Sequence, residues 1–152
     1  MNLTREDIIR KLNEEIFAAL ITIRKTKLAS RTMMFGYLKG VGIFFLTLKI
    51  TKKIKDIEYS PVGIIHLSKI EDNLPLSWNI SIPGKIEECK PDSPHYKSGF
   101  DALAKKNPQI KDLFNSDMKD NYSLLLFRIK EIQGWTYEQC ISGVNNTVVK
   151  DF

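Results

Sequence analysis

Two apolar runs separated by a glycine-containing turn constrain the fold of this 152-residue chain more than any other feature. Residues 28–35 form the first run, the second begins at Gly42, and Lys39-Gly40 lies between them. Gly40 and Gly42 can adopt the positive φ values that a tight turn needs, so the stretch predicts a β-hairpin. A helical pattern then opens at Thr51 and closes at Ser60-Pro61.

The rest of the chain also favours strands joined by short turns. Thr4 and Asp7 predict a capping box that opens a helix over residues 5–15. Further strands are predicted at 17–24, 62–67, 76–82, 85–89, 122–130 and 135–137, and helices within 91–115. Pro83-Gly84 predicts a bend or bulge and Gln133-Gly134 a turn, while the tail after Ser142 shows no pattern. We therefore expect a mainly β chain with flanking α-helices, in which six or seven antiparallel strands form a closed or nearly closed barrel.

Composition predicts one globular domain over residues 1–152, with 43% hydrophobic and 27% charged residues. The first residues carry acids where a secretory signal is basic, and no apolar run reaches the ~18 residues of a membrane span. We expect a cytoplasmic protein without a membrane partner. Cys89 and Cys140 are too few and too isolated to predict a disulfide framework or a metal site.

The net charge of +5 and the pI near 9.1 are compatible with a nucleic acid, an anionic membrane surface or a phosphorylated ligand. The lysines are scattered, and no nucleic-acid-binding motif accompanies them. A basic nucleic-acid-binding barrel is therefore supported by the net charge alone, and we expect no nucleic-acid partner.

A phosphate site is predicted where the strands meet the helix that Thr51 opens. Arg31 lies among apolar strand residues and needs an anionic partner, which a phosphate would supply bidentately. Thr47, Thr51, Lys52 and Lys53 could converge on the same point, because the first turn of a helix attracts anions and two lysines there are otherwise unfavourable. The alternatives are an arginine paired with a surface carboxylate and lysines that are simply solvated.

Candidate catalytic groups are scarce in this sequence. His66 is predicted on a strand without an acid–base partner, and His95 in a loop. No glycine-rich nucleotide loop, zinc-protease motif, CxxC motif or nucleophile elbow is present. The sequence therefore identifies no catalytic residue and predicts no metal ligand.

Several short motifs, in this order and at these spacings, resemble the pyridoxamine-phosphate-oxidase-like, FMN-binding split-barrel family. They are Arg31-Thr32-Met33, Phe45-Leu46-Thr47, Thr51-Lys52-Lys53, Ser60-Pro61-Val62, and the strand from Asn79 to Gly84. A helix within 106–113 and a tryptophan at Trp135 also fit. The resemblance extends from the first helix to Tyr137 and implies a split β-barrel.

The resemblance also implies a homodimer of split barrels, with one FMN at each end of the shared interface. Arg31 and Lys53 would hold the FMN phosphate, with Thr51 and Lys52 beside them. Main-chain groups around Thr32, Met33 and Met34 would face the isoalloxazine ring, Leu46 and Thr47 would contact the flavin, and Asn79 would replace a glutamine that touches the ring.

Two departures limit the activity that the resemblance implies. Gly36 occupies the position of a lysine that helps hold pyridoxal phosphate in the oxidase proper, and no Arg-X-His motif follows Tyr137. We therefore expect an FMN-binding flavoprotein of oxidoreductase type that does not oxidise pyridoxamine phosphate and uses a small-molecule electron donor or substrate. The alternative is a non-catalytic protein that binds or senses flavin, deazaflavin or haem on the same barrel.

Overall fold

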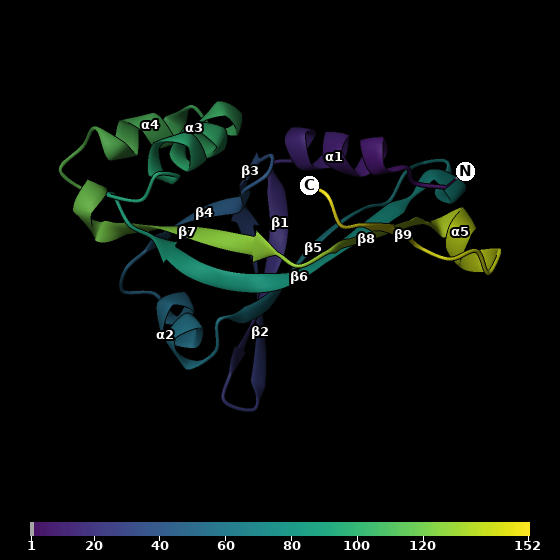
Figure 1. Ribbon diagram of the computed structural model, residues 1–152, viewed down its shortest axis with the longest axis horizontal. Coiled ribbons are helices and arrows are strands. Elements are labelled where there is room, and N and C mark those ends of the chain that lie inside the picture. The colour runs from purple at the N-terminus through teal and green to yellow at the C-terminus, as the bar shows by residue number, and fades with distance from the viewer. Residues whose placement is uncertain (1) are drawn as a thin grey trace.

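The computed structural model describes residues 2–152 and confirms a mainly β fold built on one antiparallel sheet. Seven strands follow the order β2-β1-β5-β6-β7-β4-β3, while β8 branches from β6 and β9 pairs with β8. The strands are β1 (Phe17–Arg24), β2 (Lys27–Met34), β3 (Gly36–Leu38), β4 (Gly42–Leu48), β5 (Val62–Lys69), β6 (Trp78–Cys89), β7 (Tyr122–Ile129), β8 (Ile132–Thr136) and β9 (Thr147–Val149). The sheet curls into a half-barrel with the helices at its periphery (Figure 1).

Five α-helices cover this sheet. They are α1 (Arg5–Glu14), α2 (Lys52–Tyr59), α3 (Tyr96–Lys106), α4 (Gln109–Phe114) and α5 (Tyr137–Ile141). In Figure 1, α3 and α4 lie together above β4 and β7, whereas α2 lies on the opposite side, next to the β1–β2 hairpin. Among residues 2–152, no helix combines the length and the apolar character that crossing a bilayer requires.

The predicted hairpin is wrong in its strand pairing. β2 pairs with β1 along its whole length, from Phe17 opposite Met34 to Arg24 opposite Lys27. The chain changes direction at Phe35, so the turn at Gly40 and Gly42 joins the short β3 to β4 instead. β4 takes β7 as its other neighbour. The apolar pattern predicts a strand at residues 28–35, but it does not show that this strand, β2, pairs with β1 and not with β4.

β6 is the strand about which the sheet folds. It pairs with β5 on one edge, while its other edge pairs first with β8 and then with β7. The predicted bend at Pro83-Gly84 is wrong, since β6 is continuous there and the neighbour on one edge changes instead. Gly84 is required at this point, because a Cβ built on it would lie 2.2 Å from the carbonyl oxygen of Arg128.

Two apolar clusters hold the layers together. The larger lies between the inner face of the sheet and α1, and it contains Leu12, Leu20, Phe45, Ile65 and Phe127, each at 0% exposure. The smaller joins β4 and β7 to α3 and α4 through Phe44, Leu103, Ile110 and Leu126. The two faces of β4 therefore pack in different clusters, so successive side chains of this strand point to opposite layers of the molecule.

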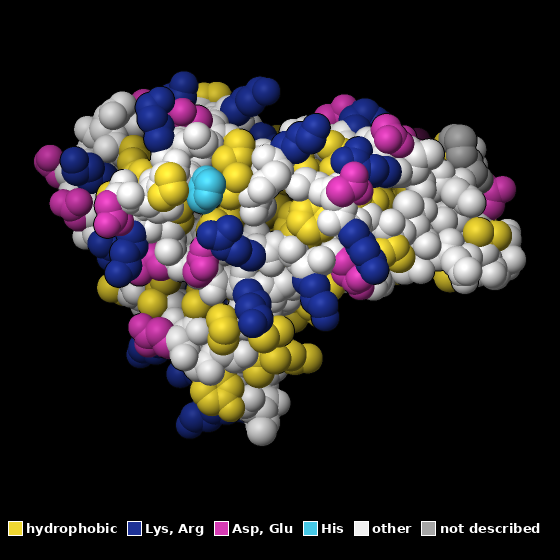
Figure 2. Space-filling model, in the orientation of Figure 1, with side chains coloured by type: hydrophobic (Ala, Val, Ile, Leu, Met, Phe, Trp, Pro, Cys, Tyr) yellow, Lys and Arg dark blue, Asp and Glu magenta, His cyan; other side chains and the backbone are white. Residues whose placement is uncertain are grey.

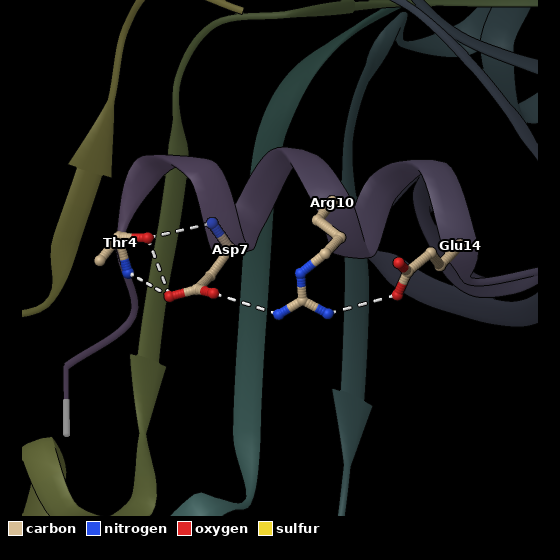
Figure 3. Close-up of polar contacts among 4 residues, drawn as sticks. All are labelled: Thr4, Asp7, Arg10 and Glu14. Carbon is tan, nitrogen blue, oxygen red and sulfur yellow. Dashed lines mark hydrogen bonds and ion pairs between the residues drawn. The ribbon is translucent and has the colours of Figure 1, made fainter.

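The first helix is fixed at both ends by polar contacts. The predicted capping box is confirmed: Thr4 Oγ1 accepts from Asp7 N–H at 3.1 Å, and Asp7 Oδ2 accepts from Thr4 N–H at 3.0 Å. Arg10 then bridges Asp7 and Glu14 along the helix (Figure 3). At the other end, Lys106 Nζ donates to the carbonyls of Leu12 and Glu15, both at 2.6 Å. Lys106 therefore ties α1 to α3.

The C-terminal region contains more structure than the sequence pattern indicated. Gly134 lies inside β8, so the turn predicted at Gln133-Gly134 is wrong. A Cβ there would lie 2.9 Å from Ile8 Cδ1, so the glycine allows α1 to approach the sheet. The predicted strand at 135–137 is cut short because Thr136 caps α5. The tail then adds β9 to the sheet.

Candidate functional site

Arg31 lies at the centre of a polar cluster between β1, β2 and α2. Its Nη1 donates to Thr22 Oγ1 at 2.9 Å, and its Nη2 donates to Asp56 Oδ2, also at 2.9 Å. The side chain of Arg31 is 22% exposed and that of Asp56 only 1%. The expectation that Arg31 needs an anionic partner is therefore confirmed, but the partner inside the chain is a buried carboxylate rather than one at the surface.

Asp56 is the residue of this cluster that the sequence reasoning missed. Its Oδ2 is shared by Arg31 and Thr22, while its Oδ1 is buried without a hydrogen bond within residues 2–152 and has Arg24 Nε 3.9 Å away. A buried acid needs such neighbours because an unpaired charge is costly in the interior. The sequence feature that could have identified Asp56 is an acid next to Ile57, on the apolar side of a short helix.

The buried face of α2 carries apolar side chains as well as Asp56. Ile54 and Ile57 pack against the larger apolar cluster, as the spacing predicts. Ile50 precedes the helix and is 90% exposed, so it does not share this face. The buried face of α2 therefore combines two isoleucines with the carboxylate that receives Arg31.

Lys53 lies near Arg31, whereas Lys52 is exposed to solvent. The pKa of Lys53 is lowered, first by partial burial and second by the positive charge of Arg31. Two cations held this close repel one another, and Asp56 carries only one compensating charge. The arrangement thus leaves positive charge at the start of α2.

Thr47 and Thr51 lie together at the N-terminal end of α2. Their hydroxyl oxygens are 3.1 Å apart, and Thr51 Oγ1 donates to the carbonyl of Leu48 at 2.9 Å. Thr51 has the extended conformation of a helix N-cap, but its side chain makes no capping bond, and the first turn of α2 contains no acid. We call Arg31, Thr47, Thr51, Lys53 and Asp56 the Arg31 cluster.

The other residues assigned to the ring lie in different environments. Met33 points inward and is 9% exposed, whereas Thr32 and Met34 lie on the exposed outer face of β2. Leu46 packs against the smaller apolar cluster, on the opposite face of β4 from Thr47. β2 is the end strand of the sheet order, so its unpaired edge is where its main-chain groups are available. Leu46 can offer only its main chain to the Arg31 cluster.

Asn79 lies far from the Arg31 cluster within one chain. Arg31 pairs with Leu20, Leu20 with Ile65, and Ile65 with Ile82, which is three positions along β6 from Asn79. Three strand spacings and three residues correspond to roughly 17 Å. Asn79 also alternates to the outer face, where its buried Oδ1 has no partner within residues 2–152. It lines a cavity of about 420 Å³ with Trp135.

The surface does not form a single basic stripe in the view of Figure 2. Lys and Arg side chains are interspersed with Asp and Glu over this face, and apolar side chains gather over the lower lobe, where Figure 1 places α2 and the β1–β2 hairpin. Within residues 2–152, no group of three or more His, Cys, Asp or Glu side chains has the geometry of a metal site. The Arg31 cluster holds two cations, Arg31 and Lys53, and one acid, Asp56.

Comparison with known proteins identifies the fold. No family model and no curated protein matches the chain. Solved structures do match. A protein described as FAD-binding, from Mesorhizobium loti, aligns with a TM-score of 0.70 and 13% identity over 89% of this chain and 96% of that one. A putative pyridoxamine 5'-phosphate oxidase from Listeria innocua aligns with a TM-score of 0.65 and 14% identity over 88% and 97%. This chain has the split-barrel fold.

The same fold appears in haem proteins. A haem-binding protein from Mycobacterium smegmatis aligns with a TM-score of 0.72 and 12% identity, over 98% of this chain and 60% of that one. Identities this low establish the split barrel and leave the ligand to be argued from the site. The resemblance seen in the short motifs is thus confirmed at the level of the fold.

Proposed function

We propose that this split-barrel protein binds FMN and that the Arg31 cluster holds its phosphate. The carrying observation is the pair of neighbouring cations, Arg31 and Lys53, next to a helix N-terminus whose first turn has no acid. Asp56 neutralises one charge of the cluster, and the remaining positive charge and the partial positive charge of the α2 N-terminus would attract a phosphate. The amides of the first turn of α2 would supply further hydrogen bonds.

The isoalloxazine ring would extend from the phosphate along the backbone of β2. The resemblance gives this role to main-chain groups around Thr32, Met33 and Met34, with Thr47 and the main chain of Leu46 as further contacts. Lys52 would remain at the rim, since its side chain is exposed. When bound, the flavin would supply the hydride or electron transfer, and the protein would position it and exclude water.

A second copy of the chain would complete the site. Asn79 is about 17 Å from Arg31 by strand spacing, on the other face of the sheet, so it cannot join the phosphate contacts of its own chain. The outer face is also rich in exposed apolar side chains, among them Phe17 at 57%, Leu28 at 75% and Val62 at 46%. We propose a homodimer in which Asn79 and Trp135 of one copy approach the ring held by the other.

Light scattering coupled to size exclusion tests the dimer. We expect a mass of twice the 17.5 kDa chain, and we expect Asn79→Ala to weaken FMN binding without changing that mass. If the monomer binds FMN as tightly as the dimer does, the proposal that two copies share the FMN site is wrong.

The absorbance spectrum of the protein as isolated tests the cofactor. Bound FMN gives a yellow protein whose pigment is released as FMN on denaturation. Bleaching by a nicotinamide donor, followed by reoxidation in air, would support an oxidoreductase over a flavin carrier. A haem spectrum would instead support the second candidate, which rests on the haem-binding protein that shares this fold. A preparation that is colourless and takes up no added FMN would overturn the proposal.

A further inference from the structure

Thr22 is a buried polar side chain on the inner face of β1. It lies at 0% exposure, with Ala29 opposite it on β2 and Gly63 opposite it on β5. Neither of these cross-strand neighbours carries a polar side chain. A buried hydroxyl costs free energy unless it is hydrogen-bonded, and valine would fill nearly the same space without that cost. The partners of this hydroxyl therefore explain why a threonine occupies the position.

The hydroxyl of Thr22 forms a closed set of hydrogen bonds with Arg31 and Asp56. Its oxygen accepts from Arg31 Nη1 at 2.9 Å and donates its proton to Asp56 Oδ2 at 3.1 Å. Arg31 Nη2 donates to the same oxygen of Asp56 at 2.9 Å. Because each of these side chains contacts the other two, the guanidinium cannot rotate without breaking a hydrogen bond. Thr22 and Asp56 together thus fix its orientation.

These contacts use only part of the hydrogen-bonding capacity of Arg31. Thr22 and Asp56 take up one N–H from each terminal nitrogen, and a guanidinium carries further N–H groups at those nitrogens and at Nε. Arg31 makes no other hydrogen bond within residues 2–152, and its side chain is partly exposed. The remaining N–H groups can therefore bind an anion while the orientation of the guanidinium is maintained.

The carboxylate that anchors Arg31 belongs to the same helix as the proposed phosphate site. Asp56 lies on α2, one turn after Lys53, and the helix begins at Lys52. In Figure 1, α2 lies next to the hairpin of β1 and β2. Asp56 therefore holds Arg31 in a defined position relative to the first turn of α2, and Thr22 holds it relative to the sheet.

We propose that Thr22 is a positioning residue that keeps Arg31 oriented to bind the phosphate of FMN. This inference rests on the proposed function, because it concerns the same site. Thr22 is fully buried, so it acts through Arg31 and not by touching the ligand. An oriented guanidinium loses less conformational freedom when the ligand binds, and this raises the affinity for the phosphate but not for the flavin ring. Thr22 thereby favours FMN over riboflavin, which lacks the phosphate.

The flavin affinities of Thr22→Val test this role, because the substitution removes the hydroxyl without changing the charge. By quenching of flavin fluorescence, we expect Thr22→Val to bind FMN about fivefold more weakly than wild type and to bind riboflavin equally well. Thr22→Ser retains the hydroxyl and should recover most of the FMN affinity. Thr26→Val, at an exposed position in the turn between β1 and β2, is the matched control and should bind both flavins as wild type does.

Nuclear magnetic resonance gives a second readout on the ligand-free protein. The side-chain Nε–H signal of Arg31 is identified by its absence from the spectrum of Arg31→Lys. We expect Thr22→Val to shift or broaden this signal, because the guanidinium gains freedom, and Thr22→Ser to preserve it. An unchanged signal in Thr22→Val would show that the hydroxyl does not hold Arg31 in place.

The role of Thr22 alone would be overturned if folded Thr22→Val kept the wild-type preference for FMN, or if it lost FMN and riboflavin affinity equally. The second result would indicate a purely structural role. Thr22→Ala, which also lacks the hydroxyl, provides the same comparison if circular dichroism shows that Thr22→Val does not fold. Equal affinities of wild type for FMN and riboflavin would instead overturn the phosphate site itself, and the role of Thr22 with it.

Discussion

Arg31 shows at the scale of single residues how this chain holds positive charge inside a sheet. The guanidinium reaches Thr22 from the neighbouring strand and Asp56 from α2, so its position is fixed before any ligand arrives. The strand pattern predicts that Arg31 needs an anion, because that follows from burial alone. It could not identify Asp56, since the pairing joins residues 25 apart whose approach depends on the tertiary fold.

Removing the carboxylate of Asp56 should destabilise the protein. Asp56→Asn leaves Arg31 without its counterion, and we expect a loss of about 2–3 kcal/mol in the free energy of unfolding, less than for a fully buried pair because Arg31 is partly exposed. Urea denaturation measures it. The double variant Arg31→Met with Asp56→Leu should recover most of the loss, and an Asp56→Asn protein within about 0.5 kcal/mol of wild type would contradict the account.

Lys106 should make stability depend on pH. Burial lowers its pKa to about 8 from the ordinary 10.5. Between these two values the unfolded chain keeps a proton that the folded protein has released, so stability from this group rises with pH across that window and is lost as pH falls through about 8. The difference in unfolding free energy between wild type and Lys106→Met should therefore move in favour of wild type from about pH 8 to about pH 10. A difference independent of pH would contradict the burial of this ammonium.

At the scale of elements, β3 and α3 pack backbone against backbone. A Cβ built on Gly36 would lie 2.5 Å from the Leu103 backbone nitrogen and 2.8 Å from the Ala102 carbonyl carbon. Gly36 stands at the position where the family resemblance implies a lysine in the oxidase proper. The structure gives the reason for its absence here, since no side chain fits at this contact.

Gly36→Ala should therefore be more harmful than the same change in a turn. We expect a loss of about 2 kcal/mol or more, because two backbone segments must separate to admit the methyl group. Gly40→Ala is the matched control: Gly40 has φ +78 and open space around it, so only its conformation is strained, at a cost of about 1 kcal/mol. Thermal denaturation of both variants measures the order, and a Gly40 variant that is the less stable of the two would contradict this packing.

Element boundaries and pairings differ in how far the sequence could predict them. Most of the longer strands and the capping box of α1 were predicted, because apolar alternation and cap residues are local signals, whereas the short β3 and β9 were not. The sequence also predicts a turn at Lys25-Thr26-Lys27, which Lys25 makes with φ 55, but that turn has no glycine, and local signals do not show that β2 pairs only with β1. The continuity of β6 through Pro83 depends on which neighbours it meets, and the sequence does not encode that locally.

At the scale of the whole molecule, a curled sheet brings β2 and α2 together at one end and β6 and β8 at another. The short motifs anticipated this split barrel, and the solved structures that share it confirm the fold. The motifs also predict that Arg31, Thr47, Thr51 and Lys53 converge on one phosphate, and this convergence stays a prediction. The motifs assign Asn79 to the flavin site, but within one chain Asn79 lies far from Arg31 and on the other face of the sheet. The proposed function therefore depends on a second copy of the chain.

A comparison of FMN with riboflavin measures the central claim most directly. The two ligands share the ring and differ in the phosphate, so quenching of flavin fluorescence reports what the Arg31 cluster contributes. We expect FMN to bind at least about tenfold more tightly than riboflavin, Lys53→Met to remove most of that difference, and Lys52→Met at the exposed neighbouring position to preserve it. Equal affinities for FMN and riboflavin in the folded wild-type protein would contradict a phosphate site at the start of α2.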